Sequence, residues 1–150
     1  MKLSKNMQVT ILVILLIISS ILLLVTKSER NALQKKIDLI YTNAISDSMG
    51  GLAKDYTQLD TDEKAQLYYQ TISNLRDATE VFYITSYKEH NYLSQTLNKL
   101  YTYLLFNKNE NYEFEDTLYI FTFLGKILVY PEDEQIISDF NDFIDSKKNN

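Results

Sequence analysis

Residues 7–26 read MQVTILVILLIISSILLLVT, and this stretch decides the architecture of the chain. From Val9 to Val25, only Thr10, Ser19 and Ser20 are not apolar. A helix of this length covers about 30 Å, the thickness of the hydrocarbon core of a bilayer. The sequence therefore predicts a transmembrane helix over 7–26, preceded by a short tail over 1–6.

A cleaved secretory signal is the alternative interpretation of the same stretch. The apolar part of such a signal is about 7–15 residues long and ends in small residues at the cleavage site. Ser19 and Ser20 partly imitate that pattern. However, the apolar run resumes from Ile21 to Val25, and no Ala-x-Ala site follows. We therefore expect a retained membrane anchor.

Charge is distributed unevenly on the two sides of residue 36. Residues 1–36 carry six Lys or Arg and one Glu, whereas the remainder carries nine Lys or Arg and nineteen Asp or Glu. The basic part suits anionic lipid headgroups. The acidic part argues against nucleic-acid binding, which depends on neutralising phosphates.

The orientation in the membrane rests on two conflicting signals. Lys2 and Lys5 form a short positive tail of the kind that stays in the cytoplasm. The opposite flank holds more cations, namely Lys27, Arg30, Lys35 and Lys36. We expect the tail 1–6 to be cytoplasmic and the domain 27–150 to be extracytoplasmic, and the reverse orientation stays open.

The segment 27–49 is expected to be a helical stalk. No Gly or Pro occurs between Met7 and Met49, so nothing forces a break after the span. The stalk has a short apolar seam with coiled-coil spacing, too short for a confident coiled coil. We expect this seam to pack on its own domain, with self-association of stalks as the alternative. The seam residues are Leu33, Ile37, Ile40 and Ala44. Gly50-Gly51 is expected to end the helix in the left-handed conformation.

Four further helices are predicted after the stalk. Asp60 and Glu63 form a capping-box pattern before an apolar face that ends near Phe82. Asn91 is expected to cap the next helix, whose face is the clearest in the chain. That face consists of Leu93, Leu97, Leu100, Tyr101, Leu104 and Leu105.

The last third of the chain leaves one alternative open. We expect a helix from Glu113 onward, but the segment 117–130 also fits a β-hairpin that turns at Gly125-Lys126. Pro131 marks a break, after which acidic residues open a final helix ending near Lys147. The prediction is thus an all-α fold: one transmembrane helix and a bundle of about four helices.

Few residues in the sequence indicate a particular reaction, metal or ligand. It has no cysteine, which excludes a disulfide framework and a thiol nucleophile. His90 is the one histidine, and a zinc site requires more ligands than that. Asp60-Thr61-Asp62 begins like a calcium loop, but Lys64 replaces the next ligand. The remaining carboxylates lie mostly at predicted helix starts. We therefore predict no catalytic, cofactor-binding or metal-binding residues.

Tyrosine is unusually frequent, with 12 Tyr and 7 Phe in 150 residues. So many rings cannot all enter a small core, and exposed aromatic side chains favour protein interfaces. The tyrosines considered for such a surface are Tyr68, Tyr69, Tyr83, Tyr87, Tyr92, Tyr101, Tyr103 and Tyr119.

These features predict a membrane-anchored, non-enzymatic protein that presents a helical domain to a protein partner in the cell envelope. A ligand-binding or sensory module that signals through a separate membrane partner is the alternative. The attraction of that alternative is the uninterrupted helix from the span into the stalk. An enzyme ranks third.

Overall fold

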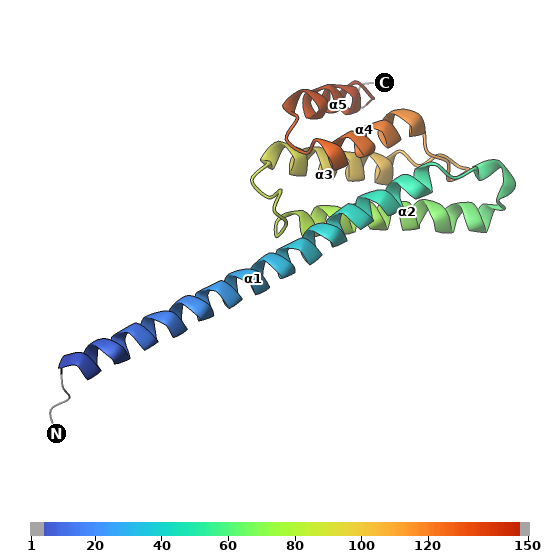
Figure 1. Cartoon of the computed structure of the whole chain (residues 1–150). Helices are drawn as coiled ribbons and strands as arrows, with labels where there is room; N and C mark the ends of the chain where they lie inside the picture. The colour runs from blue at the N-terminus through green and yellow to red at the C-terminus, as the bar shows by residue number, and fades with distance from the viewer. Residues whose placement is uncertain (1–4, 148–150) are drawn as a thin grey trace. The chain divides into compact units, whose positions relative to one another are not determined.

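The computed structural model describes the backbone of residues 5–147 and the side chains of residues 10–147. Within that range the chain is all-helical, without strands (Figure 1), which confirms the predicted fold class. The tail 1–6 lies largely outside the described residues. The elements are α1 (Lys5–Leu52), the short 3₁₀ helix η1 (Tyr56–Gln58), α2 (Thr61–Phe82), α3 (Asn91–Phe106), α4 (Thr117–Val129) and α5 (Glu134–Lys147).

The chain divides into two compact units, residues 1–36 and residues 37–150. The first unit holds the apolar part of α1, where every large side chain from Ile11 to Val25 is exposed. By length and composition this helix can cross a membrane. It continues past Thr26 without a break, as the absence of Gly and Pro predicted.

The second unit, which we call the body, begins at Ile37, inside α1. The last turns of α1 bury Tyr41, Ile45, Ser48 and Leu52, which follow one another at steps of four, three and four residues. This spacing places all four on one helix face. The end of α1 is therefore a fifth helical segment of the body.

The predicted seam of α1 coincides only in part with the face that packs. Ile37 and Ala44 are half-buried, and Ala44 packs against the core, but Ile40 remains 55% exposed and Leu33, in the first unit, 59% exposed. The packing face is centred one residue further on, at the buried Tyr41 and Ile45. Hydrophobic spacing alone did not identify it, because it excludes tyrosine and serine.

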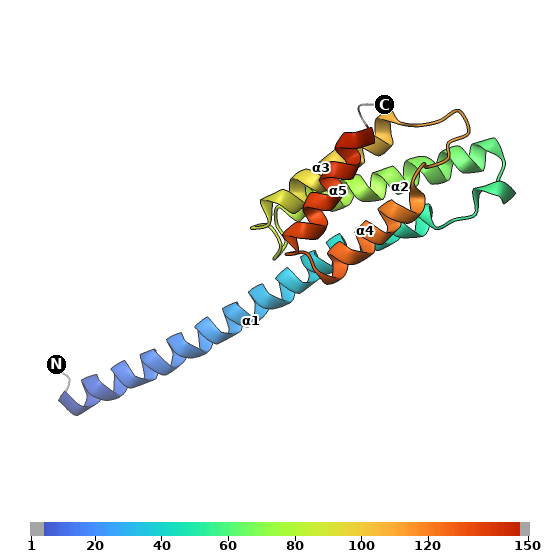
Figure 2. The same ribbon diagram turned by 90° about the horizontal axis from the view of Figure 1, so that it is seen from above.

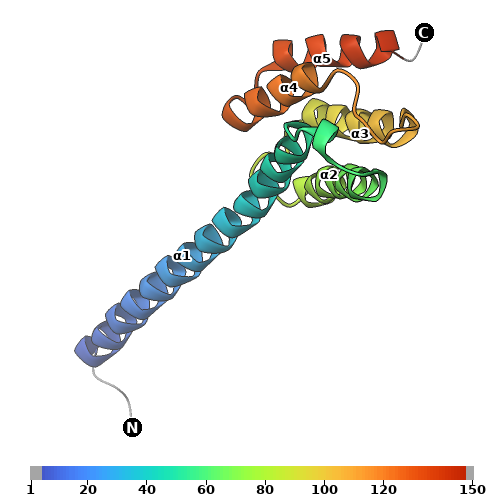
Figure 3. The same ribbon diagram turned by 90° about the vertical axis from the view of Figure 1, so that its right-hand side faces the viewer.

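The helices of the body contact one another in a closed order (Figures 2 and 3). α1 meets α2 around Gly51. α2 packs on α3, and α3 packs on α5. α5 then packs on α4 through the stacked rings of Phe123 and Phe140, whose centroids are 3.7 Å apart. α4 returns to α1, since a Cβ atom at Gly125 would lie 3.3 Å from Met49 Cε.

The connections between helices gather at two ends of the body. At one end, the Asp38 carboxylate of α1 accepts from the backbone N–H and the hydroxyl of Ser86, both at 2.8 Å. His90 Nε2 lies 3.5 Å from Glu132 Oε1 at this end, which joins the α2–α3 and α4–α5 connections. We call this the α2–α3 end. The opposite end, which holds the α3–α4 connection, is called the α3–α4 end.

Helix starts agree with the sequence where a capping side chain specifies them. The capping box of α2 is present: Glu63 N donates to Asp60 Oδ1 at 2.9 Å, and Asp60 N donates to Glu63 Oε2 at 3.1 Å. Asp133 Oδ1 accepts from the N–H groups of Gln135 and Ile136 at the start of α5. These bonds satisfy amide groups that a helix leaves unpaired at its first turn.

Two predicted starts were wrong. Asn91 is the first residue of α3, and the cap position is His90, whose side chain makes no capping bond. The fourth helix begins at Thr117, not at Glu113. Glu113 lies in the preceding loop, where its carboxylate pairs with Lys64 at 2.7 Å. The helical alternative for 117–130 is otherwise confirmed over Thr117–Val129.

Gly50 and Gly51 do not end α1 in the expected way. Both lie inside the helix, which continues to Leu52, and neither has a positive φ. Gly51 is buried against α2, and a Cβ atom there would lie 2.9 Å from the Thr71 Cβ and overlap the Thr71 hydroxyl. That hydroxyl donates to the Leu67 carbonyl at 2.8 Å, so it is not free to move aside. Gly51 thus permits a close helix crossing.

We predict that Gly51→Ala lowers the free energy of unfolding of the body by about 1–3 kcal/mol, the usual cost of overpacking. Gly50→Ala is the matched control, because nothing lies within 4 Å of the added Cβ. The control is expected to be neutral or slightly stabilising, since Ala has the higher helix propensity. Denaturant unfolding of both full-length variants in detergent, followed by circular dichroism, checks this. Equal effects of the two substitutions would contradict the close crossing.

Candidate functional site

The exposed tyrosines do not form one surface. As expected, several of the tyrosines considered lie outside the core, including Tyr69, Tyr83, Tyr92 and Tyr119. Tyr83 and Tyr92 lie toward the α2–α3 end. Tyr119 is covered on one side by Phe143 of α5, with ring centroids 4.3 Å apart. Tyr69 belongs to a separate aromatic group, at the α3–α4 end.

That group has a cation at its centre. Lys108 Nζ lies 4.3 Å from the ring centroid of Tyr112 and 5.9 Å from that of Tyr69, and it donates to the Tyr69 hydroxyl at 3.5 Å. The two rings meet edge to face at 5.9 Å. Phe106, two residues before Lys108, is 78% exposed. We call Tyr69, Phe106, Lys108 and Tyr112 the aromatic surface.

The loop that carries this surface is conformationally strained. Tyr112 and Asp116 have φ values of 56° and 54°, and they are the non-glycine residues with positive φ in the described chain. Such a conformation is unusual for a bulky side chain and persists only where surrounding contacts enforce it. Strain of this kind concentrates at functional sites.

Hydrogen bonds within the loop enforce its shape. Asn109 Oδ1 accepts from the N–H groups of Asn111 and Glu113, at 3.1 and 2.8 Å. Tyr112 N donates to the Asn109 carbonyl at 3.2 Å. One short polar side chain therefore folds four residues of backbone into a turn.

Ion pairs tie the loop to helices on both sides. Lys64 of α2 pairs with Glu113 at 2.7 Å, and the Lys64 side chain is only 18% exposed. Lys147 of α5 pairs with Asp116 Oδ2 at 2.7 Å. The pKa of Lys147 is raised, first by its hydrogen bond to Asp116. The loop is thus held at both of its ends, and the aromatic surface is presented in one arrangement.

A second aromatic layer lies beneath the exposed one. Phe114 stacks on Tyr68 with centroids 4.2 Å apart and meets Tyr56 edge to face at 6.0 Å. Tyr68 donates its hydroxyl proton to the Leu104 carbonyl at 2.5 Å. Burial raises the pKa of both tyrosines to about 12. Through these contacts, η1, α2, α3 and the loop pack against one another beneath the aromatic surface.

The surface combines flat apolar rings with one charged group. The pKa of Lys108 is raised, first by its hydrogen bond to Tyr69, so the ammonium stays protonated at physiological pH. Aromatic rings with a polar tip bury a large area at low entropic cost, which makes them frequent anchors of protein interfaces.

The histidine and the carboxylates that the sequence offered as other candidates lie in ion pairs or hydrogen bonds within the fold. His90 is half-buried beside Glu132. Asp145 pairs with Lys99 at 3.0 Å, and Asp139 accepts from Gln135 Nε2 at 2.6 Å. Among the described residues, no cluster of three His, Cys, Asp or Glu side chains could hold a metal ion.

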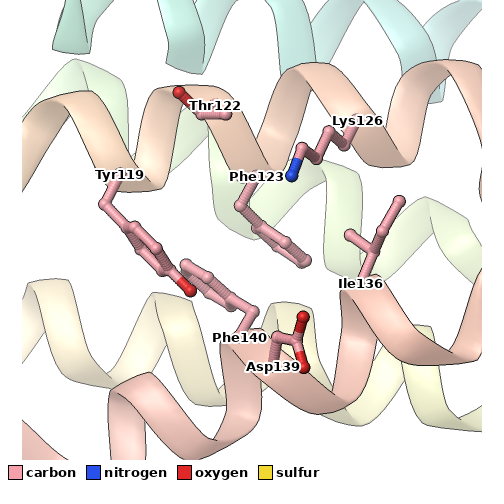
Figure 4. A pocket seen from close by; sticks show the side chains of 7 residues that line it. All are labelled: Tyr119, Thr122, Phe123, Lys126, Ile136, Asp139 and Phe140. Carbon is pink, nitrogen blue, oxygen red and sulfur yellow. The ribbon is translucent and has the colours of Figure 1, made fainter.

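A small pocket between α4 and α5 is lined by residues of both helices, among them Lys126 of α4 and Asp139 and Phe140 of α5 (Figure 4). Its volume is about 60 Å³. Sites for small organic ligands measure about 300–1,000 Å³, so this pocket is large enough only for one or two water molecules.

The sequence did not single out Phe106, Lys108 or Tyr112. The stretch Asn107–Asn111 reads as an ordinary polar break after a helix, and Tyr112 follows it without any periodic neighbour. One signal was present: Phe106 continues the apolar end of α3 off the face formed by Leu97, Leu100 and Leu104. A large ring at such a position is expected to be exposed.

Comparison of the chain with protein-family models, with curated proteins and with solved structures found no match.

We predict that the body loses stability as the pH rises from 10 toward 12. Tyr56 and Tyr68 have folded-state pKa values of about 12 against an ordinary value of 10. A raised pKa stabilises the fold fully below pH 10, and this contribution disappears as the pH passes through the folded pKa. Melting temperatures across this range, together with tyrosinate absorbance, measure the effect.

Tyr68→Phe separates this effect from general alkaline damage. It removes the hydrogen bond to Leu104, which costs about 1 kcal/mol at neutral pH. It also removes one titrating group, so the decrease in stability above pH 10 becomes smaller. Tyr130→Phe, at an exposed ring, is the control and should leave the alkaline decrease unchanged. If both variants behave as the parent above pH 10, Tyr68 is not responsible.

Proposed function

We propose that this chain is a membrane-anchored, non-enzymatic interaction protein that binds a protein partner of the cell envelope through its aromatic surface. The observation that carries the proposal is the strained loop 107–116, which ion pairs tie to α2 and α5 and which places Lys108 and the Tyr112 ring beside the exposed Tyr69. An ordinary helix connection requires neither the strain nor the exposed rings. Rigid, exposed aromatic anchors are what a partner can bind tightly.

The anchor in this proposal is the apolar part of α1. Its side chains from Ile11 to Val25 are exposed, and an exposed apolar surface of that size is stable in lipid but not in water. The basic residues that follow the span suit a headgroup layer. The helical bundle of the body then lies on the extracytoplasmic side, with the N-terminus in the cytoplasm.

The sensory alternative is favoured by one observation, the continuity of α1 from the apolar segment into the core of the body. A signal that changed the packing of Tyr41 or Ile45 would reach the span through one helix. Such a module also needs a ligand site. The α4–α5 pocket is too small for one, and the hollow of about 500 Å³ along Asp116–Thr122 is shallow and open to solvent rather than enclosing. We therefore place partner binding first.

We predict that Tyr69→Ala combined with Phe106→Ala reduces capture of the partner about ten-fold or more, because loss of one aromatic anchor costs about 2 kcal/mol. A photo-crosslinking residue at position 106, used in native membranes, should give a discrete product. The matched control is Tyr92→Ala with Tyr130→Ala, two equally exposed rings away from the loop. A loss of capture in the control of the same size would show that the aromatic surface is not the binding site.

Membrane insertion and orientation can be tested together, because the chain has no cysteine. We expect Ser73→Cys, at an exposed position of α2, to react with a membrane-impermeant thiol reagent in intact cells. Lys5→Cys should react only after the membrane is opened. The opposite pattern would reverse the orientation. Full-length chain recovered in the soluble fraction would exclude the anchor itself.

A further inference from the structure

Lys108 differs from the two lysines that tie its loop to the helices. Lys64 and Lys147 each pair with a carboxylate at 2.7 Å. Lys108 pairs with no carboxylate in the described part of the chain. The rings of Tyr69 and Tyr112 hold its ammonium instead, together with a hydrogen bond to the Tyr69 hydroxyl at 3.5 Å. Such contacts position the cation but leave most of its N–H donors to water.

The carboxylates of the loop 107–116 do not supply the missing pair. Glu113 and Asp116 are engaged with lysines of α2 and α5. Glu110 and Glu115 are exposed, and neither forms an ion pair with a described residue. The loop therefore presents one cation held on aromatic rings, together with two carboxylates that have no cation of their own.

A partner that covers the rings also removes water from the Lys108 ammonium. Taking a charge out of water is costly unless an opposite charge replaces the water. Loss of the proton does not remove this cost, because the hydrogen bond to Tyr69 raises the pKa of Lys108. Rotation of the side chain into the surrounding water would forfeit both ring contacts. The occupant of this surface must therefore bring an anionic group to Lys108.

We propose that the partner binds the aromatic surface through an aspartate or glutamate side chain that pairs with Lys108, within a segment that is otherwise apolar, uncharged or basic. Apolar side chains of that segment cover the exposed rings. Further acidic residues would meet Glu110, Glu115 and the negative charge of the body, which repel them. This inference names the chemistry of the partner and rests on the proposed function.

Carbodiimide crosslinking of the full-length chain in native membranes tests the pair directly. The reagent activates a carboxylate and joins it to an amine in direct contact with it, so that an amide forms and the reagent leaves as a urea. We expect an amide between the Lys108 Nζ and an Asp or Glu of another protein, located by mass spectrometry of the crosslinked peptide. Lys88, which is exposed in the α2–α3 connection, is the internal control and should form such links several-fold less often.

Variants at position 108 test the charge without the carbodiimide. With the photo-crosslinking residue at position 106 as readout, Lys108→Gln should lower the product about ten-fold or more, because the carboxylate of the partner is left unpaired. Lys108→Arg keeps the charge and should retain the photo-crosslinked product, yet it should lose the amide, since a guanidinium does not react with the reagent. Lys88→Gln is the matched control and should leave the product unchanged.

The remaining outcomes separate this inference from the proposed function. If Lys108→Gln leaves the product unchanged or increases it, whereas Tyr69→Ala combined with Phe106→Ala removes it, the aromatic surface stands and the anionic partner is wrong. Amides that join Lys108 only to carboxylates of its own chain overturn the inference in the same way. If the double alanine variant keeps the product, the aromatic surface is not the binding site, and both proposals fail.

Discussion

The packing of the last turns of α1 into the body is the interaction on which the rest of the structure depends. Tyr41, Ile45, Ser48 and Leu52 are buried in the core, where Tyr41 meets Phe82 of α2 edge to face at 5.8 Å and Ser48 donates to the Thr71 carbonyl of α2 at 3.3 Å. The close crossing at Gly51 sets how near α2 can approach. These residues belong to the same continuous helix as the apolar segment.

This arrangement leaves the α3–α4 end of the body free to present a rigid surface. The α3–α4 connection is fixed by short-range hydrogen bonds to Asn109 and by ion pairs to Lys64 and Lys147. Phe114 anchors it from below by stacking on Tyr68. A loop with this many restraints loses little conformational entropy when a partner binds. At the α2–α3 end, by contrast, the Asp38 carboxylate of α1 accepts two hydrogen bonds from Ser86, which connect α1 to the α2–α3 connection.

The sequence by itself determined the class of the fold, the apolar segment 7–26, the start of α2 at its capping box and the clear stripe of α3. These features are local: hydrophobic period and capping need only neighbours a few residues away. Only the tertiary structure decided that α1 packs through Tyr41 rather than Ile40, that Gly51 admits α2, that Glu113 pairs with Lys64 and that Tyr112 lies beside Tyr69. Each of these depends on which distant segment lies opposite, and no periodicity along one chain encodes that.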